Sequence, residues 1–405
     1  MAQNRARDGL QRWLVLAGGF LTTMAAIGAT TYSFGLYVKP VSAEFLLNRT
    51  DANRGMQALL LGMMLWSPLV GFLLPKWGGR LVIALGGVAV AAGGWMMSGA
   101  QSAAMIFAVI LGPVALGVVA IGILSANSLV AAWFEEGRSR ALGILSVSTS
   151  AGGFAIVPLV ARLMNGGDWR QAALYSGFGV GALALLVAAV LIRPEPRRLD
   201  REAIGLRSGK PNIIGRPDFW WCTVAIALLI SSDQALLASL IPHLQDQKLS
   251  TGQAAAVMSA VTFSAIAGKL VVGWAAERVP LVRLFAIVVA CNVGLILVLL
   301  VTNVPWILIM AALTIGIAIG GVFPLWSISL SRLFQPVDFP KAFGLSATFI
   351  TLAGMASIEL TGRLYDRTGN YALAFAVLAL WAVASTGAFW LARSDRGGST
   401  ALAGR

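Results

Sequence analysis

The sequence predicts an all-α membrane protein with twelve transmembrane helices in two pseudo-symmetric bundles of six. Three observations predict this fold. The 405 residues are 58% hydrophobic and only 12% charged, whereas soluble globular proteins carry about 25% charged residues. Twelve apolar runs have about the length of 20 residues that a bilayer core requires. The two halves of the chain also repeat each other.

The apolar runs are separated by short polar segments, and the longest of these segments divides the chain in two. We predict an N-terminal bundle over residues 1–192, a linker over residues 193–218 and a C-terminal bundle over residues 219–405. The first run is too long for a signal-peptide core, so we expect it to remain as an uncleaved span. The predicted spans are 13–38, 56–74, 81–99, 104–132, 140–163, 171–192, 219–243, 253–274, 283–302, 305–331, 341–364 and 371–392.

The net charge of +13 comes from basic residues that lie between the apolar runs. They form no stripe on a soluble face, so we expect a lipid bilayer and no nucleic acid as the partner. The side that holds both termini and the linker has 21 Lys and Arg residues, the opposite side has 8, and Lys269 completes the total of 30. Basic residues favour the cytoplasmic side. We therefore predict a multi-pass protein of the cell inner (plasma) membrane with both termini in the cytoplasm.

The residue types that build metal sites and disulfide frameworks are scarce. Cys222 and Cys291 are the only cysteines, both inside apolar runs, and His243 is the only histidine. No metal site, disulfide framework or cofactor follows from this composition. We also find no catalytic constellation and no ATP-hydrolysing motif. The chain is therefore not expected to be an enzyme, and an ion or solute gradient is expected to supply its energy.

The two halves share landmarks in the same order, with an offset near 201 residues. The segment from Gly71 to Arg80 matches the segment from Gly273 to Arg283. The segment from Arg140 to Gly143 matches the segment from Lys341 to Gly344. Parallel repeats of six helices predict a binding site near the bilayer midplane.

Polar residues gather in the first, fourth, seventh and tenth spans, whereas the third, sixth, ninth and twelfth are almost purely apolar. We predict that the first group lines a cavity and that the second faces lipid. A single Ser or Thr in a membrane helix usually bonds its own backbone, so only the grouping is informative. Trp326 is either a cavity wall or a packing residue. The candidate substrate-binding residues are Tyr32, Asn127, Asp233, Gln234, Lys269 and Trp326.

Lys269 is the most informative of these residues because it lies inside an apolar run. It precedes Glu277 by eight residues, which is about 12 Å of helix at a rise of ~1.5 Å per residue. A charge at this depth costs roughly 3 kcal/mol unless it faces water, a partner or a ligand. We interpret Lys269 as a binding residue for an anion. The alternative is a structural lysine that reaches the interface or is neutralised by burial.

Two acidic residues are candidates for proton coupling. Asp233 lies in the middle of the seventh span, where it is either a protonation site, a counter-ion for Lys269 or a carboxyl that stays protonated within the bundle. Glu359 lies four residues before Arg363 in the eleventh span. Residues at this spacing are neighbours on a helix, so an ion pair at the outer gate is the alternative to a proton carrier.

These landmarks resemble the major facilitator superfamily over essentially the whole chain. That superfamily has twelve helices in two bundles and moves solutes by alternating access. Its Gly-x-x-x-Asp-Arg-x-Gly pattern resembles the segment from Gly71 to Arg80, where Pro75 replaces the acid of the gate. A second copy resembles the segment from Gly273 to Arg283. The gate and motif residues that the resemblance implies are Gly71, Arg80, Arg140, Gly273, Glu277, Arg278 and Asp366.

Finer features are similar to the branch of monocarboxylate porters and oxalate/formate antiporters. They include the segments from Tyr32 to Pro40, from Trp133 to Gly143, from His243 to Asp246 and from Gly362 to Tyr371. In that branch a cation in helix 8, usually an arginine four residues before a glycine, binds the carboxylate.

The same spacing implies this role for Lys269, which stands four residues before Gly273. The chain departs from the branch in three ways. Ala265 stands where animal members have an aspartate, and Tyr32 stands where they have a lysine. A lysine also offers a point charge where arginine offers a fork. The exact substrate is therefore not implied.

The leading hypothesis is a secondary transporter of a small organic anion, a monocarboxylate or a dicarboxylate, by proton symport or anion exchange. The alternatives are an efflux pump for amphipathic drugs and a non-transporting membrane receptor on the same fold. A deep cation disfavours the efflux pump, and the receptor would leave Lys269 and Asp233 without a purpose.

Overall fold

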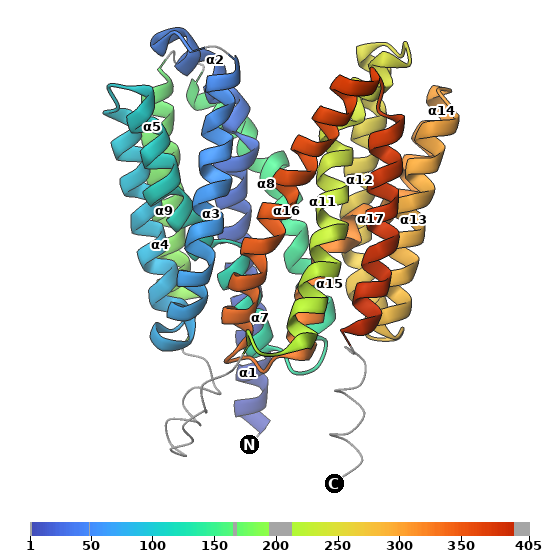
Figure 1. The fold of residues 1–405 in the computed structure, drawn as a ribbon. Helices are drawn as coiled ribbons and strands as arrows, with labels where there is room; N and C mark the ends of the chain where they lie inside the picture. Colours follow the sequence, from blue (N-terminus) through green and yellow to red (C-terminus); the bar gives the residue numbers. More distant parts are fainter. Residues whose placement is uncertain (1, 48, 165–167, 194–212, 393–405) are drawn as a thin grey trace. The chain divides into compact units, whose positions relative to one another are not determined.

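The computed structural model describes residues 2–47, 49–164, 168–193 and 213–392. Most of the predicted linker lies outside these residues. Within the described ranges the secondary structure is helical, and twelve helical segments are long and apolar enough to cross a membrane (Figure 1). The predicted all-α fold of twelve transmembrane helices is confirmed, and each observed segment overlaps the span predicted for it.

A tight turn joins α3 to α4 in the N-terminal half. Pro75 lies inside α3, which continues to Trp77, and the chain then turns at Gly78, where φ is 80°. A positive φ is readily adopted only by glycine. The elements are α1 (Ala2–Ile27), η1 (Gly28–Tyr32), α2 (Phe34–Phe45), α3 (Arg49–Trp77), α4 (Gly79–Ser98), α5 (Ala103–Val109), η2 (Ile110–Val114), α6 (Ala115–Ile121), α7 (Ile123–Trp133), α8 (Arg138–Met164) and α9 (Trp169–Val190).

The C-terminal half has the same order of spans. Its seventh span begins with Pro217 in the first turn of the helix, where a missing N–H is tolerated. The elements are α11 (Pro217–Asp246), α12 (Thr251–Ala275), α13 (Leu281–Val301), α14 (Pro305–Ile315), α15 (Ile317–Leu333), α16 (Phe339–Thr368) and α17 (Ala372–Leu391).

Three spans with grouped polar residues are interrupted. The first span contains the π-helix η1, the fourth contains the π-helix η2 and a break at Gly122, and the tenth breaks at Gly316. The purely apolar spans are single helices, α4, α9, α13 and α17. Irregular backbone in a membrane is tolerated where protein or a water-filled cavity surrounds it.

The chain forms two compact units. The first comprises Met1–Ala141, Leu145–Lys210 and Pro336–Thr348, and the second comprises Leu142–Ile144, Pro211–Gln335 and Phe349–Arg405. The start of α16 therefore belongs to the first unit, where Thr348 Oγ1 donates a hydrogen bond to the Met64 carbonyl at 3.0 Å.

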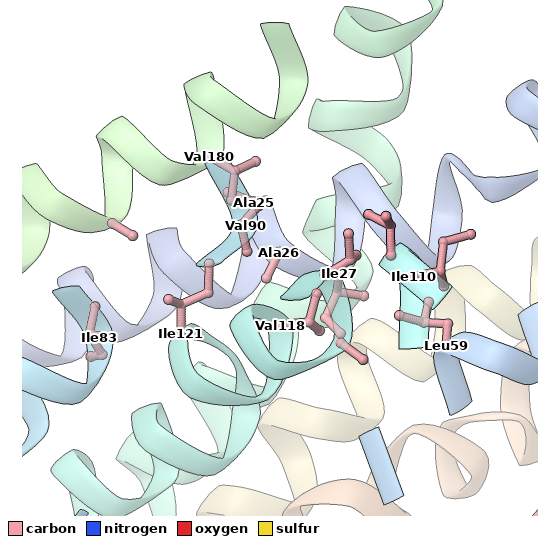
Figure 2. Close-up of a cluster of buried hydrophobic side chains, with 14 of the residues drawn as sticks. Ala25, Ala26, Ile27, Leu59, Ile83, Val90, Ile110, Val118, Ile121 and Val180 are labelled. Atoms are coloured by element: carbon pink, nitrogen blue, oxygen red, sulfur yellow. The ribbon is translucent and has the colours of Figure 1, made fainter. Parts of the chain in front are cut away.

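The core of the first unit is formed by aliphatic side chains from α1, α3, α4, η2, α6 and α9 (Figure 2). Ile83 and Ile121 are fully buried, and Val118 and Val180 lie in the same cluster. The α4 and α9 backbones touch, because a Cβ atom on Gly94 would lie 2.8 Å from Gly177 Cα. Gly94 and Gly177 therefore allow α4 and α9 to pack closely.

The core of the second unit includes a layer of leucines and aromatic rings. Phe285 of α13 and Phe389 of α17 stack at 4.1 Å between ring centroids. His243 is buried in the same unit, where it bonds the Leu299 carbonyl at 3.1 Å and packs on Phe375. These contacts give His243 a structural role in joining α11, α13 and α17.

Candidate functional site

Lys269 lies on α12, and only 5% of its surface is exposed. The helix begins with a capping box, in which Ser250 and Gln253 satisfy each other's backbone N–H groups. Ser264 Oγ, one turn before Lys269, donates a hydrogen bond to the Ala312 carbonyl of α14 at 2.8 Å. The contact with α14 therefore helps to fix the position of the helix that carries Lys269.

Glycines bring α15 into backbone contact with α12 just before this position. A Cβ atom on Gly268 would overlap the Ile317 carbonyl oxygen, and one on Gly320 would overlap the Ala265 carbonyl oxygen. Gly143 of α8 also belongs to the second unit, and a Cβ atom there would lie 2.9 Å from the Lys269 carbonyl oxygen. Small residues allow membrane helices to approach this closely.

Trp326 lies on α15 in the same unit as Lys269, and 6% of its surface is exposed. The tenth span breaks at Gly316, ten residues before it. The second unit thus contains a buried cation and a buried indole on two helices that touch. An indole offers one N–H donor and a wide apolar face.

Asp233 lies on α11 and is 6% exposed. Its Oδ1 atom accepts a hydrogen bond from the amide nitrogen of Asn292 on α13. Asn292 is fully buried and is a site residue that the sequence reasoning missed. A single amide in an otherwise apolar span was the signal for it, because a buried polar group needs a partner.

Gln234 follows Asp233 in the chain, but its side chain takes a different direction. Its Oε1 atom lies against Gly354 of α16, so closely that a Cβ atom on that glycine would overlap it. Neighbouring residues on a helix point about 100° apart. Asp233 and Gln234 therefore contact different helices, α13 and α16.

Two candidates belong to the first unit. Asn127 of α7 is buried, with 4% of its surface exposed. Tyr32, at the end of η1, is 47% exposed, and its ring covers Gly153 of α8, where a Cβ atom would lie 3.1 Å from it. Their roles in binding remain predictions.

Glu359 and Arg363 form the expected ion pair on α16, with 2.9 Å between Arg363 Nε and Glu359 Oε1. Their side chains are 66% and 71% exposed. Exposed pairs of this kind contribute about 0–1 kcal/mol. The predicted pairing is confirmed, and its role at a gate remains a prediction.

The first copy of the motif places Gly71 against α16, since a Cβ atom there would lie 2.5 Å from the Pro340 carbonyl oxygen. Arg80 Nη2 donates a hydrogen bond to the Ala189 carbonyl at 3.4 Å. Pro75 does not end α3, so this helix keeps its length although the acid is absent.

The second copy places Gly273 against Gly143, with 2.8 Å between a Cβ built on Gly143 and Gly273 Cα. The Arg278 guanidinium lies over the Trp274 ring at 3.9 Å from its centroid, which is close enough for a cation–π interaction. Arg140, Glu277 and Asp366 lie in the first turn of α8, directly after α12 and near the end of α16, respectively.

An apolar cavity of about 100 Å³ lies within the first unit. Its polar lining residues are Thr30, Tyr37 and Ser176, and Tyr37 Oη and Ser176 Oγ are 3.2 Å apart. No charged residue lines it. Among the residues that the structure describes, no cluster of three or more His, Cys, Asp or Glu residues could hold a metal ion.

Comparison with known proteins gives consistent results. The sequence model described as Major Facilitator Superfamily matches residues 18–358 and 223–404. Monocarboxylate transporter 13 of Rattus norvegicus is 26% identical over 387 residues, which are 94% of this chain and 88% of the relative. Monocarboxylate transporter 11 of Homo sapiens is 28% identical over 91% of this chain and 80% of the relative.

A solved structure shares the fold. The proton:xylose symporter XylE, bound to 6-bromo-6-deoxy-D-glucose, superposes with a TM-score of 0.76 and 13% sequence identity. The match covers 95% of this chain and 96% of the symporter.

Proposed function

We propose a transport function on the premise that this chain belongs to the Major Facilitator Superfamily, whose sequence model covers most of its length. In this proposal the protein is a secondary active transporter that moves a small organic anion, a monocarboxylate or dicarboxylate, by alternating access. The observation that carries the proposal is Lys269, a cation with 5% of its surface exposed inside the apolar helix α12.

The electrostatics of Lys269 favour an anionic ligand. Two opposite charges about 4 Å apart attract by about 4 kcal/mol at an effective dielectric constant of 20. The net gain on binding is smaller, because the ligand loses its own hydration. A carboxylate beside Lys269 would thus offset the cost of a charge in the bilayer.

The relatives favour a carboxylate over other anions. Two of them are named monocarboxylate transporters, and they align with more than nine-tenths of this chain. In our proposal Lys269 binds the carboxylate, and Tyr32, Asn127, Gln234 and Trp326 contribute polar and apolar contacts. The gate and motif residues close the pathway on the cytoplasmic side.

Coupling is proposed to be either proton symport or anion exchange. Asp233 and Glu359 are the two candidate proton carriers. The gradients that drive the two mechanisms differ, so a transport assay separates them.

A panel of radiolabelled monocarboxylates and dicarboxylates in proteoliposomes tests this function. With a carboxylate inside and outside, we expect exchange of label. With an inward pH gradient, symport predicts accumulation, whereas pure exchange predicts none. Neutral amides of the same acids are the matched controls and are expected to be poor substrates. Equal transport of acids and amides would contradict the anion proposal.

A second candidate function is the export of amphipathic solutes. The apolar cavity of the first unit favours it, because its lining carries no charge. This function predicts transport of lipophilic cations that does not depend on Lys269. A non-transporting receptor would bind a carboxylate without moving it in any of these assays.

We also propose that the protein lies in the cell inner membrane with both termini and residues 193–218 in the cytoplasm. The basis is the excess of basic residues on that side. In a background without Cys222 and Cys291, an impermeant thiol reagent should label Asn53→Cys in intact cells. It should label Gly205→Cys only after permeabilisation. Labelling of Gly205→Cys in intact cells would reverse the orientation.

A further inference from the structure

The contact between Asp233 and Asn292 leaves one polar atom without a partner. The Asn292 amide nitrogen donates to Asp233 Oδ1. The other polar atom of the same amide, Asn292 Oδ1, is buried and accepts no hydrogen bond from the residues that the structure describes. Asn292 itself is fully buried. Buried acceptors are nearly always satisfied, so this one requires an explanation.

A proton on Asp233 would satisfy that acceptor. An ionised carboxylate can only accept hydrogen bonds, whereas a carboxylic acid also donates one. The acid O–H at Oδ2 would then donate to Asn292 Oδ1, while the amide N–H continues to donate to Asp233 Oδ1. This two-bond ring between an acid and a primary amide uses every polar atom of the contact.

The contact between Asp233 and Asn292 contains no paired charge. The hydrogen bond to Asp233 Oδ1 comes from the neutral amide of Asn292 and not from a cation. Ionised carboxylates in an apolar setting require a paired charge. The ionisable groups of the neighbouring helices are Lys269 on α12, Arg283 and Cys291 on α13, Arg332 on α15, and Lys341, Glu359, Arg363, Tyr365, Asp366 and Arg367 on α16, with none on α17. On α11 itself the others are Asp218, Cys222, His243 and Asp246.

We propose that Asp233 and Asn292 together form the proton-binding site of this chain. A hydronium ion of the aqueous solution supplies the proton, so that one of its O–H bonds breaks to leave water while the O–H bond at Asp233 Oδ2 forms, and no electron is gained or lost. Loss of the proton opens the ring and leaves a carboxylate that must find another donor. The inference rests on the proposed transport function and deepens it, because it assigns the proton to Asp233 rather than to Glu359.

Glu359 has the opposite environment. Its side chain is 66% exposed, and its carboxylate already accepts a hydrogen bond from Arg363 at 2.9 Å. The ionised Glu359 carboxylate therefore already has a hydrogen-bond donor and does not need to be protonated. Glu359→Gln is therefore the matched control for Asp233→Asn, since both changes replace a carboxyl by an amide on a membrane-spanning helix.

Infrared difference spectroscopy of the full chain in lipid vesicles tests the proton site directly. Between alkaline and acidic buffer, we expect the carbonyl band of one protonated, buried carboxylic acid. The band should shift when aspartate is labelled with carbon-13 in the wild-type chain, and it should be lost in Asp233→Asn. It should be unchanged in Glu359→Gln. In Asn292→Leu the band should move to higher frequency or disappear, because its hydrogen-bond partner is gone.

If a variant does not fold, the carbon-13 shift in the wild-type chain still tests whether the band belongs to an aspartate. Absence of an aspartate band in the wild type, or its persistence in a folded Asp233→Asn, would overturn the proposal. An unchanged frequency in a folded Asn292→Leu would remove Asn292 from the site.

Transport in the same vesicles separates this inference from the proposed function. Asp233→Asn should lose accumulation driven by a pH gradient and keep exchange of internal for external carboxylate, because exchange needs no net proton movement. Asn292→Leu should lower accumulation about tenfold, which corresponds to ~1.4 kcal/mol, and also keep exchange. Normal accumulation in Asp233→Asn would overturn the proton site. Failure of the wild type to transport any carboxylate would instead overturn the proposed function.

Discussion

The two halves of the chain repeat the same six spans, but they bury different chemistry. Among the described residues before α11, every buried polar side chain is neutral. The C-terminal half buries Asp233, His243 and Lys269. The first unit instead encloses an apolar cavity with Tyr37 and Ser176 as a polar pair. The repeat therefore maintains the packing of helices, whereas the buried ionisable residues are concentrated in one half.

Packing through glycine is what the halves share. Gly94 and Gly177 bring α4 and α9 into contact in one half, and Gly268 and Gly320 bring α12 and α15 into contact in the other. These contacts need only a missing side chain, and they join different pairs of spans, the third with the sixth in one half and the eighth with the tenth in the other. A buried charge instead needs specific partners.

Loss of the charge on Lys269 should have the largest effect. A charge-assisted hydrogen bond is worth roughly 1.5–3 kcal/mol, so Lys269→Met should weaken binding of a carboxylate by about ten- to a hundredfold at ~1.4 kcal/mol per decade. Lys269→Arg should keep part of the activity, because the charge remains while the shape changes. Binding to purified protein and uptake into vesicles measure both.

Lys39→Met is the matched control. Lys39 is an exposed lysine on α2, in the half whose buried polar side chains are neutral. Lys39→Met should leave affinity unchanged. A neutral amide of the substrate should bind poorly to the wild type and lose little more in Lys269→Met. Normal transport by Lys269→Met at normal surface expression would make this lysine a structural residue and remove the difference between the halves.

Adding a methyl group at the glycine contacts should destabilise both halves alike. Gly268→Ala would push a methyl group into the Ile317 carbonyl, and Gly94→Ala would place one 2.6 Å from the Ala173 carbonyl oxygen. Overpacking typically costs about 1–3 kcal/mol, which a thermal melt in detergent should detect. Gly179→Ala meets no atom within 4 Å and should be neutral or slightly stabilising, because alanine favours helix. Equal melting temperatures for all three variants would argue against close packing at Gly268 and Gly94.

The polar pair of the apolar cavity should contribute modestly. Tyr37→Phe removes the hydrogen bond to Ser176, which is worth about 0.5–1.5 kcal/mol. A double-mutant cycle with Ser176→Ala isolates that energy from the loss of the hydroxyl itself. Anion affinity should not change, since neither residue carries a charge. A tenfold loss of carboxylate affinity in Tyr37→Phe would show that the N-terminal half also contributes to carboxylate binding.

The smallest effect is expected for the exposed ion pair of α16. Glu359→Gln should change stability by about 0–1 kcal/mol, and less at high salt, because water and ions screen the pair. Accumulation driven by a pH gradient should be retained. Loss of this accumulation in Glu359→Gln would instead make Glu359, an exposed acid, the coupling residue.

Much of the fold could be predicted because hydropathy and charge are local properties. A run of about 20 apolar residues spans a bilayer whatever surrounds it, so twelve spans were predicted and observed. The depth of Lys269 followed from the same pattern. The breaks at η1, η2, Gly122 and Gly316 were not predicted, because the spans were placed by hydropathy, which does not distinguish regular from irregular helix.

The tertiary structure alone decided how the polar side chains pair. The sequence placed Asp233 and Gln234 together in one polar group, but the structure directs them to α13 and α16. Asn292 was not predicted as a site residue because it lies in an apolar span, yet its amide donates a hydrogen bond to Asp233. The composition of a span determines that it crosses the membrane, whereas its partners depend on the rotation of each helix about its axis. That rotation is set by packing against neighbours far away in the chain.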